Sequence, residues 1–384
     1  MSSIPAWGYL VVLVGSLGLS LGLVPVALAV AVRTGALDHP GPAKSHDKAV
    51  PYLGGAAIVI AFAAVVLIGN AIDPPPSGYY QLVGFLGLGV LLSLVGLVDD
   101  LRTGGLSPLL RLAFEVGAAV AVCALGTNAH LAGFPAAAND VITVLWVVGV
   151  TNAFNLLDNM DGLSAGIATI ACLAIFGVAA LQQRYLVAAL ALSMAGCAAG
   201  FLRSNFHPAK IYMGDAGSLF LGFVIAVLLL KLRGNAPTRV PIAVILAIPG
   251  VALFDTTLVT ISRLAHHCSP FQGGKDHTSH RLLRLGFSVR QAVATIYAAG
   301  VLLGAAAVGM AEVGDGIRLI GIFALAAVTA LSAYPLGRVP TYPLADALGT
   351  ASRGTTAIPA NRAPLHRPRS GTRRSIETTH TSRD

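Results

Sequence analysis

Residues 80–100 read YQLVGFLGLGVLLSLVGLVDD, an almost wholly apolar run that ends on the adjacent carboxylates Asp99 and Asp100. A run of about 20 such residues is long enough to cross the hydrocarbon core of a bilayer as a helix. Comparable runs occur at 7–32, 52–72, 109–127, 140–156, 162–182, 185–202, 216–232, 240–262, 290–311 and 314–335. The sequence therefore predicts an all-α polytopic membrane protein with about eleven transmembrane helices, or about ten if the short 140–156 run does not cross.

The composition of the whole chain supports this fold class. Of its 384 residues 55% are hydrophobic and 11% are charged, whereas an average soluble domain has roughly 25% charged residues. A water-soluble globular fold and a disordered chain are both excluded by these figures. The four cysteines include no C-x-x-C pair, so neither a disulfide framework nor a zinc site is predicted.

The distribution of lysine and arginine predicts how the chain is oriented. Twenty of the 25 basic residues fall in one set of alternate loops and the C-terminal tail, and five fall in the opposite set. Because basic residues mark the cytoplasmic side, the N-terminus is predicted outside and the C-terminus in the cytoplasm. The exception is the outer loop 231–239, which carries Lys231, Arg233 and Arg239.

The net charge of +8 does not indicate a nucleic-acid partner, because basic loops of membrane proteins lie beside anionic lipid head groups. From about residue 338 the chain is rich in Arg, Thr, Ser and Pro. We therefore predict two parts, an integral membrane domain over 1–337 and a basic, disordered cytoplasmic tail over 338–384.

Carboxylates at the ends of apolar runs are the first candidates for a functional site, because ionisable groups at membrane depth are costly. Asp99 and Asp100 would oppose the dipole of the helix that they end, and a bound cation or a cationic partner would offset that cost. In TNAFNLLDNMDGL the residues Asn152, Asn155 and Asp158 share one helical face. Their oxygens suit Mg²⁺ or hydrogen bonds to a sugar and a base, while the alternative is a polar helix end followed by a turn at Asp161.

The segment 212–218, YMGDAGS, lies where a cytoplasmic loop enters an apolar helix. A glycine-containing helix N-terminus favours an anion, although Asp215 and Ser218 are also ordinary capping residue types. Tyr212 is suited to stack on a planar ring or to lie at the membrane interface.

The loop 263–290 contains His277 and His280 among Lys275, Arg281 and Arg284. A zinc site would need ligands beyond Asp276, so mixed cations here favour a diphosphate clamp. The alternative is a solvated basic loop. Taken together, the residues indicate metal-assisted phosphate chemistry between a soluble donor and a lipid acceptor at the inner membrane face. A transporter of an anionic solute is the main alternative, but it would place charges near the bilayer midplane.

Five motifs in order then resemble the polyprenyl-phosphate N-acetylhexosamine-1-phosphate transferases of glycosyltransferase family 4. They are KSH (44–46) with PYLGG (51–55), GLVDDL with LSP (106–108), NAFNLLDNMDGLSAG, FHPAKIYMGDAGSLFLG and DHTSHRLLRLGFS. The resemblance covers about 33–290. It implies transfer of a sugar-1-phosphate from a UDP-sugar to polyprenyl phosphate with release of UMP, the first lipid-linked step of cell-surface or cell-wall polysaccharide synthesis. It also implies a multi-pass protein of the cytoplasmic membrane, Mg²⁺ as the metal with Mn²⁺ as the alternative, and membrane lipids as partners; a homodimer stays open.

The resemblance also implies roles for individual residues. Asp99 and Asp100 would be the catalytic acidic pair, Asp158 a catalytic residue and metal ligand, and Asp215 the main metal ligand. The donor and acceptor would be bound by His46, Lys48, Asn155, Asp161, Tyr212, His277, His280 and Arg281.

Two departures from the family pattern bear on the donor sugar. Asn159 stands where glycine is common, and the histidine motif is thinned to His277-Thr278-Ser279-His280. The thinner motif favours the N-acetylglucosamine-like branch over the phospho-N-acetylmuramoyl-pentapeptide transferases. We expect direct attack by the lipid phosphate, because a phosphate monoester is already largely dianionic at pH 7; a covalent aspartyl route is the alternative.

Overall fold

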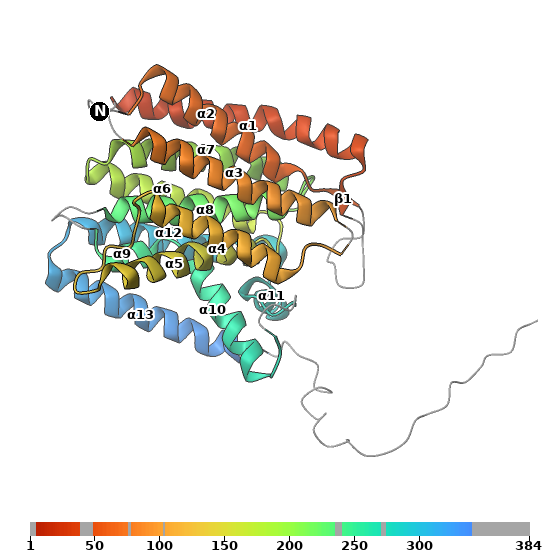
Figure 1. Cartoon of the computed structure of the whole chain (residues 1–384). Helices are drawn as coiled ribbons and strands as arrows, with labels where there is room; N and C mark the ends of the chain where they lie inside the picture. The colour runs from red at the N-terminus through yellow and green to blue at the C-terminus, as the bar shows by residue number, and fades with distance from the viewer. Residues whose placement is uncertain are drawn as a thin grey trace, which may run out of the picture. The chain divides into compact units, whose positions relative to one another are not determined.

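The computed structural model describes residues 5–38, 49–75, 78–102, 104–234, 240–269 and 274–339 (Figure 1). They belong to one compact unit, 1–341. The predicted tail falls almost entirely outside these residues, so the division at 337 stays a prediction. The helices are α1 (Ala6–Thr34), α2 (Gly54–Ile72), α3 (Tyr79–Leu101), α4 (Pro108–Ala124), α5 (Ala136–Leu157), α6 (Leu163–Leu181), α7 (Tyr185–Asn205), α8 (Gly214–Arg233), α9 (Ile242–Ala247), α10 (Gly250–Ala265), α11 (Thr278–Arg284), α12 (Val289–Glu312) and α13 (Asp315–Gly337).

The prediction of a polytopic helical membrane protein is confirmed. Within the described residues, eight helices are long and apolar enough to cross a membrane: α1, α2, α3, α5, α6, α7, α8 and α12. Helix α4 has 17 residues, close to the lower limit for a span.

The predicted run 240–262 is not one continuous helix. Helix α9 ends at Ala247 and α10 begins at Gly250, on either side of Pro249. Proline has no N–H to donate, and its ring clashes with the carbonyl four residues earlier, which here belongs to Ile245. The break lets α10 leave the common direction of the other long helices (Figure 1).

Helix α8 is the centre of the bundle. Of its apolar span 89% is buried, against 17% for α1. Two glycines let neighbouring helices approach its backbone closely: a Cβ on Gly55 of α2 would collide with Gly217, and one on Gly96 of α3 would collide with the backbone of Asp215. The contact at Gly96 brings the C-terminal turn of α3 against the N-terminal turn of α8.

A small non-helical element holds the loop before α8. Strands β1 (Leu37–Asp38) and β2 (Val50–Pro51) are antiparallel, with Leu37 opposite Pro51. The Tyr212 N–H donates to the Pro51 carbonyl at 2.7 Å, and the Gly54 N–H donates to the Tyr212 carbonyl at 3.0 Å. Strands of two residues are too short to give an alternating pattern in the sequence, which is why an all-α reading did not include them.

The bundle has two ends. We call the end where α3 finishes and α8 begins the site end, and the opposite end the far end. Arg290, at the start of α12, donates to the His207 carbonyl at 3.2 Å at the site end. Gln182, after α6, donates to Glu312 at 3.4 Å at the far end. Helix α12 therefore runs from the site end to the far end and finishes beside the end of α6.

Candidate active site

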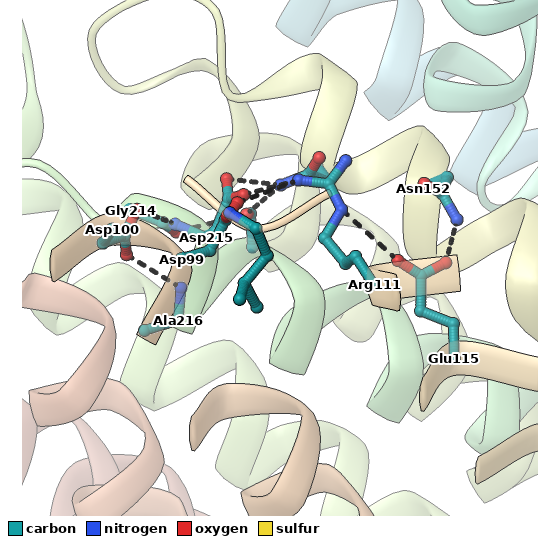
Figure 2. A network of polar contacts seen from close by, with 11 residues as sticks. Asp99, Asp100, Arg111, Glu115, Asn152, Gly214, Asp215 and Ala216 are labelled. Carbon is teal, nitrogen blue, oxygen red and sulfur yellow. Dashed lines mark hydrogen bonds and ion pairs between the residues drawn. The ribbon is translucent and has the colours of Figure 1, made fainter. Parts of the chain in front are cut away.

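Asp100 caps the N-terminus of α8. Its two carboxylate oxygens accept the backbone N–H groups of Asp215 at 3.0 Å and Ala216 at 3.2 Å (Figure 2). Gly214 precedes them with φ of 69°, and a side chain there would collide with the Asp100 carboxylate. The negative charge that opposes the dipole of α3 thus stabilises the positive end of α8.

Asp99 and Asp215 share one cation, Arg111 of α4. Arg111 Nη1 lies 2.7 Å from Asp215 Oδ2 and 3.4 Å from Asp99 Oδ2. The other Asp99 oxygen accepts the backbone N–H of Leu106. Figure 2 shows the carboxylates of Asp99 and Asp215 grouped on one side of the guanidinium. Arg111 is thus a cationic partner for Asp99 that belongs to the protein itself.

Asn155 fixes the second oxygen of Asp215. Its Nδ2 donates to Asp215 Oδ1 at 2.8 Å and to Ser218 Oγ at 2.9 Å. Ser218 in turn donates to the Gly214 carbonyl at 3.1 Å. Helices α5 and α8 are thus connected through an amide and a carboxylate, as the predicted polar face of α5 requires.

Glu115 contacts the Nε side of the Arg111 guanidinium and so helps to orient it. Neither residue was among the predicted site residues. Glu115 is 2% exposed, and its Oε1 lies 3.7 Å from Arg111 Nε. Asn152 Nδ2 donates to the other Glu115 oxygen. The signal in the sequence is the Arg111/Glu115 pair at a spacing of four, which places both on one face of α4.

Asp158 lies just beyond the last residue of α5 and faces the same group of acids. Burial raises the pKa of Asp158 to about 8, and the negative charges of Asp215 and Asp100 add to the shift. No hydrogen bond reaches its carboxylate from any residue in the described ranges. A carboxylate of this kind favours a cation as its partner.

Asp161 has a different surrounding. His207 Nδ1 lies 2.8 Å from Asp161 Oδ2, and the Ala209 N–H donates to the same oxygen at 3.0 Å. Asp161 thereby ties the turn after α5 to the loop before α8. Tyr212 in that loop is partly buried, and burial together with the Asp161 charge raises its pKa to about 12.

The histidine motif packs against α10 and the α5–α6 turn. His277 Nδ1 lies 2.8 Å from Asp255 Oδ2, and the Thr278 N–H donates to the other Asp255 oxygen at 2.6 Å. Ser279 Oγ donates to Asn159 Oδ1 at 2.6 Å. The two departures from the family pattern, at positions 159 and 279, therefore contact each other.

His280 is held neutral. Burial lowers its pKa to about 4, with the neighbouring His277 and Lys275 adding to the shift. At neutral pH this side chain offers an imidazole rather than a charge to a phosphate.

Arg281 is completely buried. Its guanidinium donates to the carbonyls of Asp276 and Leu336, each at 2.7 Å, and to Ser262 Oγ at 3.0 Å. These contacts favour a structural role for Arg281 over the predicted substrate contact, because its donors already have partners inside the fold. The predicted ligands His46 and Lys48 lie outside the described residues.

Within the described ranges no three His, Cys, Asp or Glu side chains form a ready-made metal cage. Mg²⁺ does not need one, since it is usually held by one or two carboxylates together with substrate phosphates and water. Asp215 and the unpaired Asp158 are suited to that kind of site.

Comparison with known proteins identifies the family of the chain. A sequence model described as glycosyl transferase family 4 matches residues 82–233, which include Asp99, Arg111, Asn155 and Asp215.

The chain matches three relatives over most of their length. A Bacillus subtilis protein named "Probable undecaprenyl-phosphate N-acetylglucosaminyl 1-phosphate transferase" is 33% identical over 79% of this chain and 85% of its own. A Mycolicibacterium smegmatis protein named "Decaprenyl-phosphate N-acetylglucosaminephosphotransferase" is 29% identical over 78% of this chain and 81% of its own. A "Phospho-N-acetylmuramoyl-pentapeptide-transferase" of Heliobacterium modesticaldum is 32% identical over 60% of this chain and 78% of its own. By the extent of these matches, the chain belongs to glycosyl transferase family 4, the polyprenyl-phosphate N-acetylhexosamine-1-phosphate transferases.

Proposed function

We propose that this protein transfers N-acetylglucosamine 1-phosphate from UDP-N-acetylglucosamine to a polyprenyl phosphate, releasing UMP. The observation that carries the proposal is the convergence of Asp99, Asp100, Asn155 and Asp215 with the cation Arg111 at one end of the helices. The names of the relatives support the lipid acceptor and the N-acetylglucosamine donor.

The residues suit a reaction in which one diphosphate bond breaks and another forms. Such a step is nearly balanced, so catalysis has to come from positioning and from neutralising charge. Arg111 is placed to meet phosphate oxygens, because its guanidinium matches their geometry. Asp99 would orient the acceptor phosphate or take a residual proton, and Asp100 would hold the first turn of α8 in place.

The site also fits Mg²⁺ on the chemistry of its donors. Asp215 and Asp158 would hold the ion, which would neutralise the diphosphate when bound. Arg111 now lies on one oxygen of Asp215, so this side chain would have to release that oxygen to the metal. Asn155 would keep the carboxylate oriented through its other oxygen.

We further propose that the site end faces the cytoplasm in the cytoplasmic membrane. Eleven crossings, with α4, the α9–α10 pair and α13 added to the eight long spans, would put the N-terminus outside and the C-terminus inside. The excess of basic residues in the site-end loops supports this orientation. After removal of Cys123 and Cys268, Arg102→Cys should react with an impermeant thiol reagent only in permeabilised cells, and Asp73→Cys should react in intact cells. The reverse pattern would refute the topology.

A donor screen tests the reaction. Purified protein, Mg²⁺ and polyprenyl phosphate should release UMP from UDP-N-acetylglucosamine and not from UDP-N-acetylmuramoyl-pentapeptide, the donor suggested by the Heliobacterium relative. Asp215→Asn should abolish release, while the matched far-end variant Asp73→Asn should keep it, because Asp73 is an exposed residue after α2. Full activity of Asp215→Asn would show that the metal assignment is wrong.

A further inference from the structure

A cavity of about 480 Å³ lies at the far end of the bundle, between α2, α3, α7 and α8. Its walls are mainly apolar and include Phe62, Val66, Phe85, Val187, Leu190 and Phe223. Lys231, which also lines it, is sixteen residues along α8 from Asp215. At about 1.5 Å per residue that is roughly 24 Å of helix. The cavity is therefore separate from the acidic site.

Lys231 is the one cationic side chain in the lining of this cavity. Its Nζ donates to Gln81 Oε1 at 2.7 Å and lies 5.1 Å from the centre of the Phe85 ring. Gln81 is fixed in turn by donating to the Leu125 carbonyl at 2.7 Å. No carboxylate of the described residues pairs with Lys231. The ammonium group thus meets neutral dipoles and a ring face, but no counter-charge.

Lys231 belongs to the segment 231–239, whose basic residues are the exception to the distribution of lysine and arginine that predicts the orientation of the chain. The structure gives a role to Arg233 in this segment but not to Lys231. Arg233 is 8% exposed and donates to the carbonyls of Ala129 at 2.8 Å and Val240 at 3.2 Å, so it stabilises the fold. Lys231 makes no comparable contacts with the backbone of other elements. Among the described residues its charge at the edge of the apolar cavity therefore has no carboxylate partner.

We propose that this cavity binds one anionic phospholipid of the surrounding membrane, with an acyl chain against the apolar walls and the phosphate beside Lys231. The cavity volume lies within the usual range of ligand pockets, roughly 300–1,000 Å³. Its position at the end of a membrane span is the level at which phospholipid head groups lie. The lone cation complements the net negative charge of an anionic phospholipid, whereas a zwitterionic head group carries its own cation beside the phosphate. The proposal does not depend on the transfer reaction.

The test measures lipid binding by the full-length protein in detergent. Native mass spectrometry and thermal unfolding are followed during titration with phosphatidylglycerol or with phosphatidylcholine of the same acyl chains. The wild type should retain one phosphatidylglycerol molecule and unfold at a higher temperature, with little response to phosphatidylcholine. Lys231→Met should weaken phosphatidylglycerol binding about fivefold, as expected for one lysine beside an anionic lipid. Lys231→Arg should retain binding, and UMP release should be unchanged in both variants.

A second variant tests the cavity itself. Val187→Trp places a large ring in the cavity and should abolish phosphatidylglycerol retention, whereas Leu302→Trp on the exposed face of α12, where Leu302 is 72% exposed, should not. Equal binding of both lipids, or binding that survives both Lys231→Met and Val187→Trp, would overturn the proposal. Displacement of phosphatidylglycerol from this cavity by polyprenyl phosphate at equal concentration would also overturn it, because the bound lipid would then be the acceptor.

Discussion

Replacing Arg111 by methionine removes the cation that joins Asp99, Asp215 and Glu115 while keeping a side chain of similar length. The two ion-pair distances, 2.7 and 3.4 Å, correspond to about 5–6 kcal/mol of gross attraction each at an effective dielectric constant of about 20. Most of this attraction is offset by the free energy needed to remove the guanidinium from water, a cost that the variant no longer has. Loss of one partner from a fully buried pair costs about 3–5 kcal/mol. Because Arg111 is 25% exposed, we expect the free energy of unfolding to fall by about 1–3 kcal/mol.

The site chemistry predicts a second effect of the same change. Without Arg111 the Oδ2 atom of Asp215 becomes available to a divalent cation, while Asn155 still holds Oδ1. Mg²⁺ should therefore raise the unfolding temperature of Arg111→Met by more than it raises that of the wild type. UMP release should nevertheless fall by about two to three orders of magnitude, the usual cost of losing one preorganised charge-stabilising donor. The rate of UMP release by Arg111→Lys should lie between those of the wild type and Arg111→Met, because a lysine cannot contact Asp215 and Glu115 at once.

Thermal unfolding with and without Mg²⁺, alongside a UMP-release assay, measures these effects. Arg203→Met is the matched control, because Arg203 is an exposed arginine in the last turn of α7. If Arg111→Met unfolded like the wild type and gained no extra stabilisation from Mg²⁺, the inference that Arg111 occupies a metal-binding oxygen would be wrong.

Three further results are expected. Asp99→Asn and Asp100→Asn should each lower the rate of transfer by orders of magnitude while leaving membrane insertion intact, as measured by UMP release and by the yield of folded protein. Gly214→Ala should lower the unfolding temperature, because a left-handed conformation costs a residue with a Cβ about 1–2 kcal/mol, and activity should fall with it since the new methyl group displaces Asp100. His280 has a pKa of about 4 in the fold, below the ordinary value near 6.5 of the unfolded chain. Its contribution to stability is therefore present above about pH 6.5 and is lost as the pH falls toward 4; His280→Gln should flatten that decline in unfolding curves at pH 4.5–7.5, and an unchanged pH dependence would contradict it.

The sequence predicted the residues of the acidic site because their positions depend on simple rules. Asp99 and Asp215 lie at the end of one apolar run and the start of another, and alternation of helix direction puts both at one membrane face. Asn152 and Asn155 are three residues apart, which places them on one face of α5. What the sequence alone left open was which acid meets which partner, because Arg111 and Asp215 are 104 positions apart.

The sequence did not predict which groups Arg111 and Arg281 would contact. Neither Arg111 nor Glu115 was among the predicted site residues. Arg281 belongs to a basic loop and was expected to bind phosphate, yet the packing of the end of α13 against α11 buries it. When a segment far away in the sequence buries a residue of a short motif, the pattern of apolar residues within that motif does not reveal it. The break at Pro249 was not predicted, because the apolar run 240–262 is long enough for a single span.

The hydrogen bonds of Arg281 also define how short the protein can be made. Its Nη1 donates to the carbonyl of Leu336 at 2.7 Å and to that of Val339 at 3.4 Å, so the last turn of α13 closes the hydrogen-bonding shell of a buried guanidinium. A deletion that starts after Thr341 should yield a well-behaved protein for purification. One that starts before Leu336 would remove both acceptors of Nη1 from a guanidinium in the interior and should give aggregated material, although it removes only a few more residues. The functional C-terminus of the membrane domain is therefore set by an arginine more than 50 positions upstream.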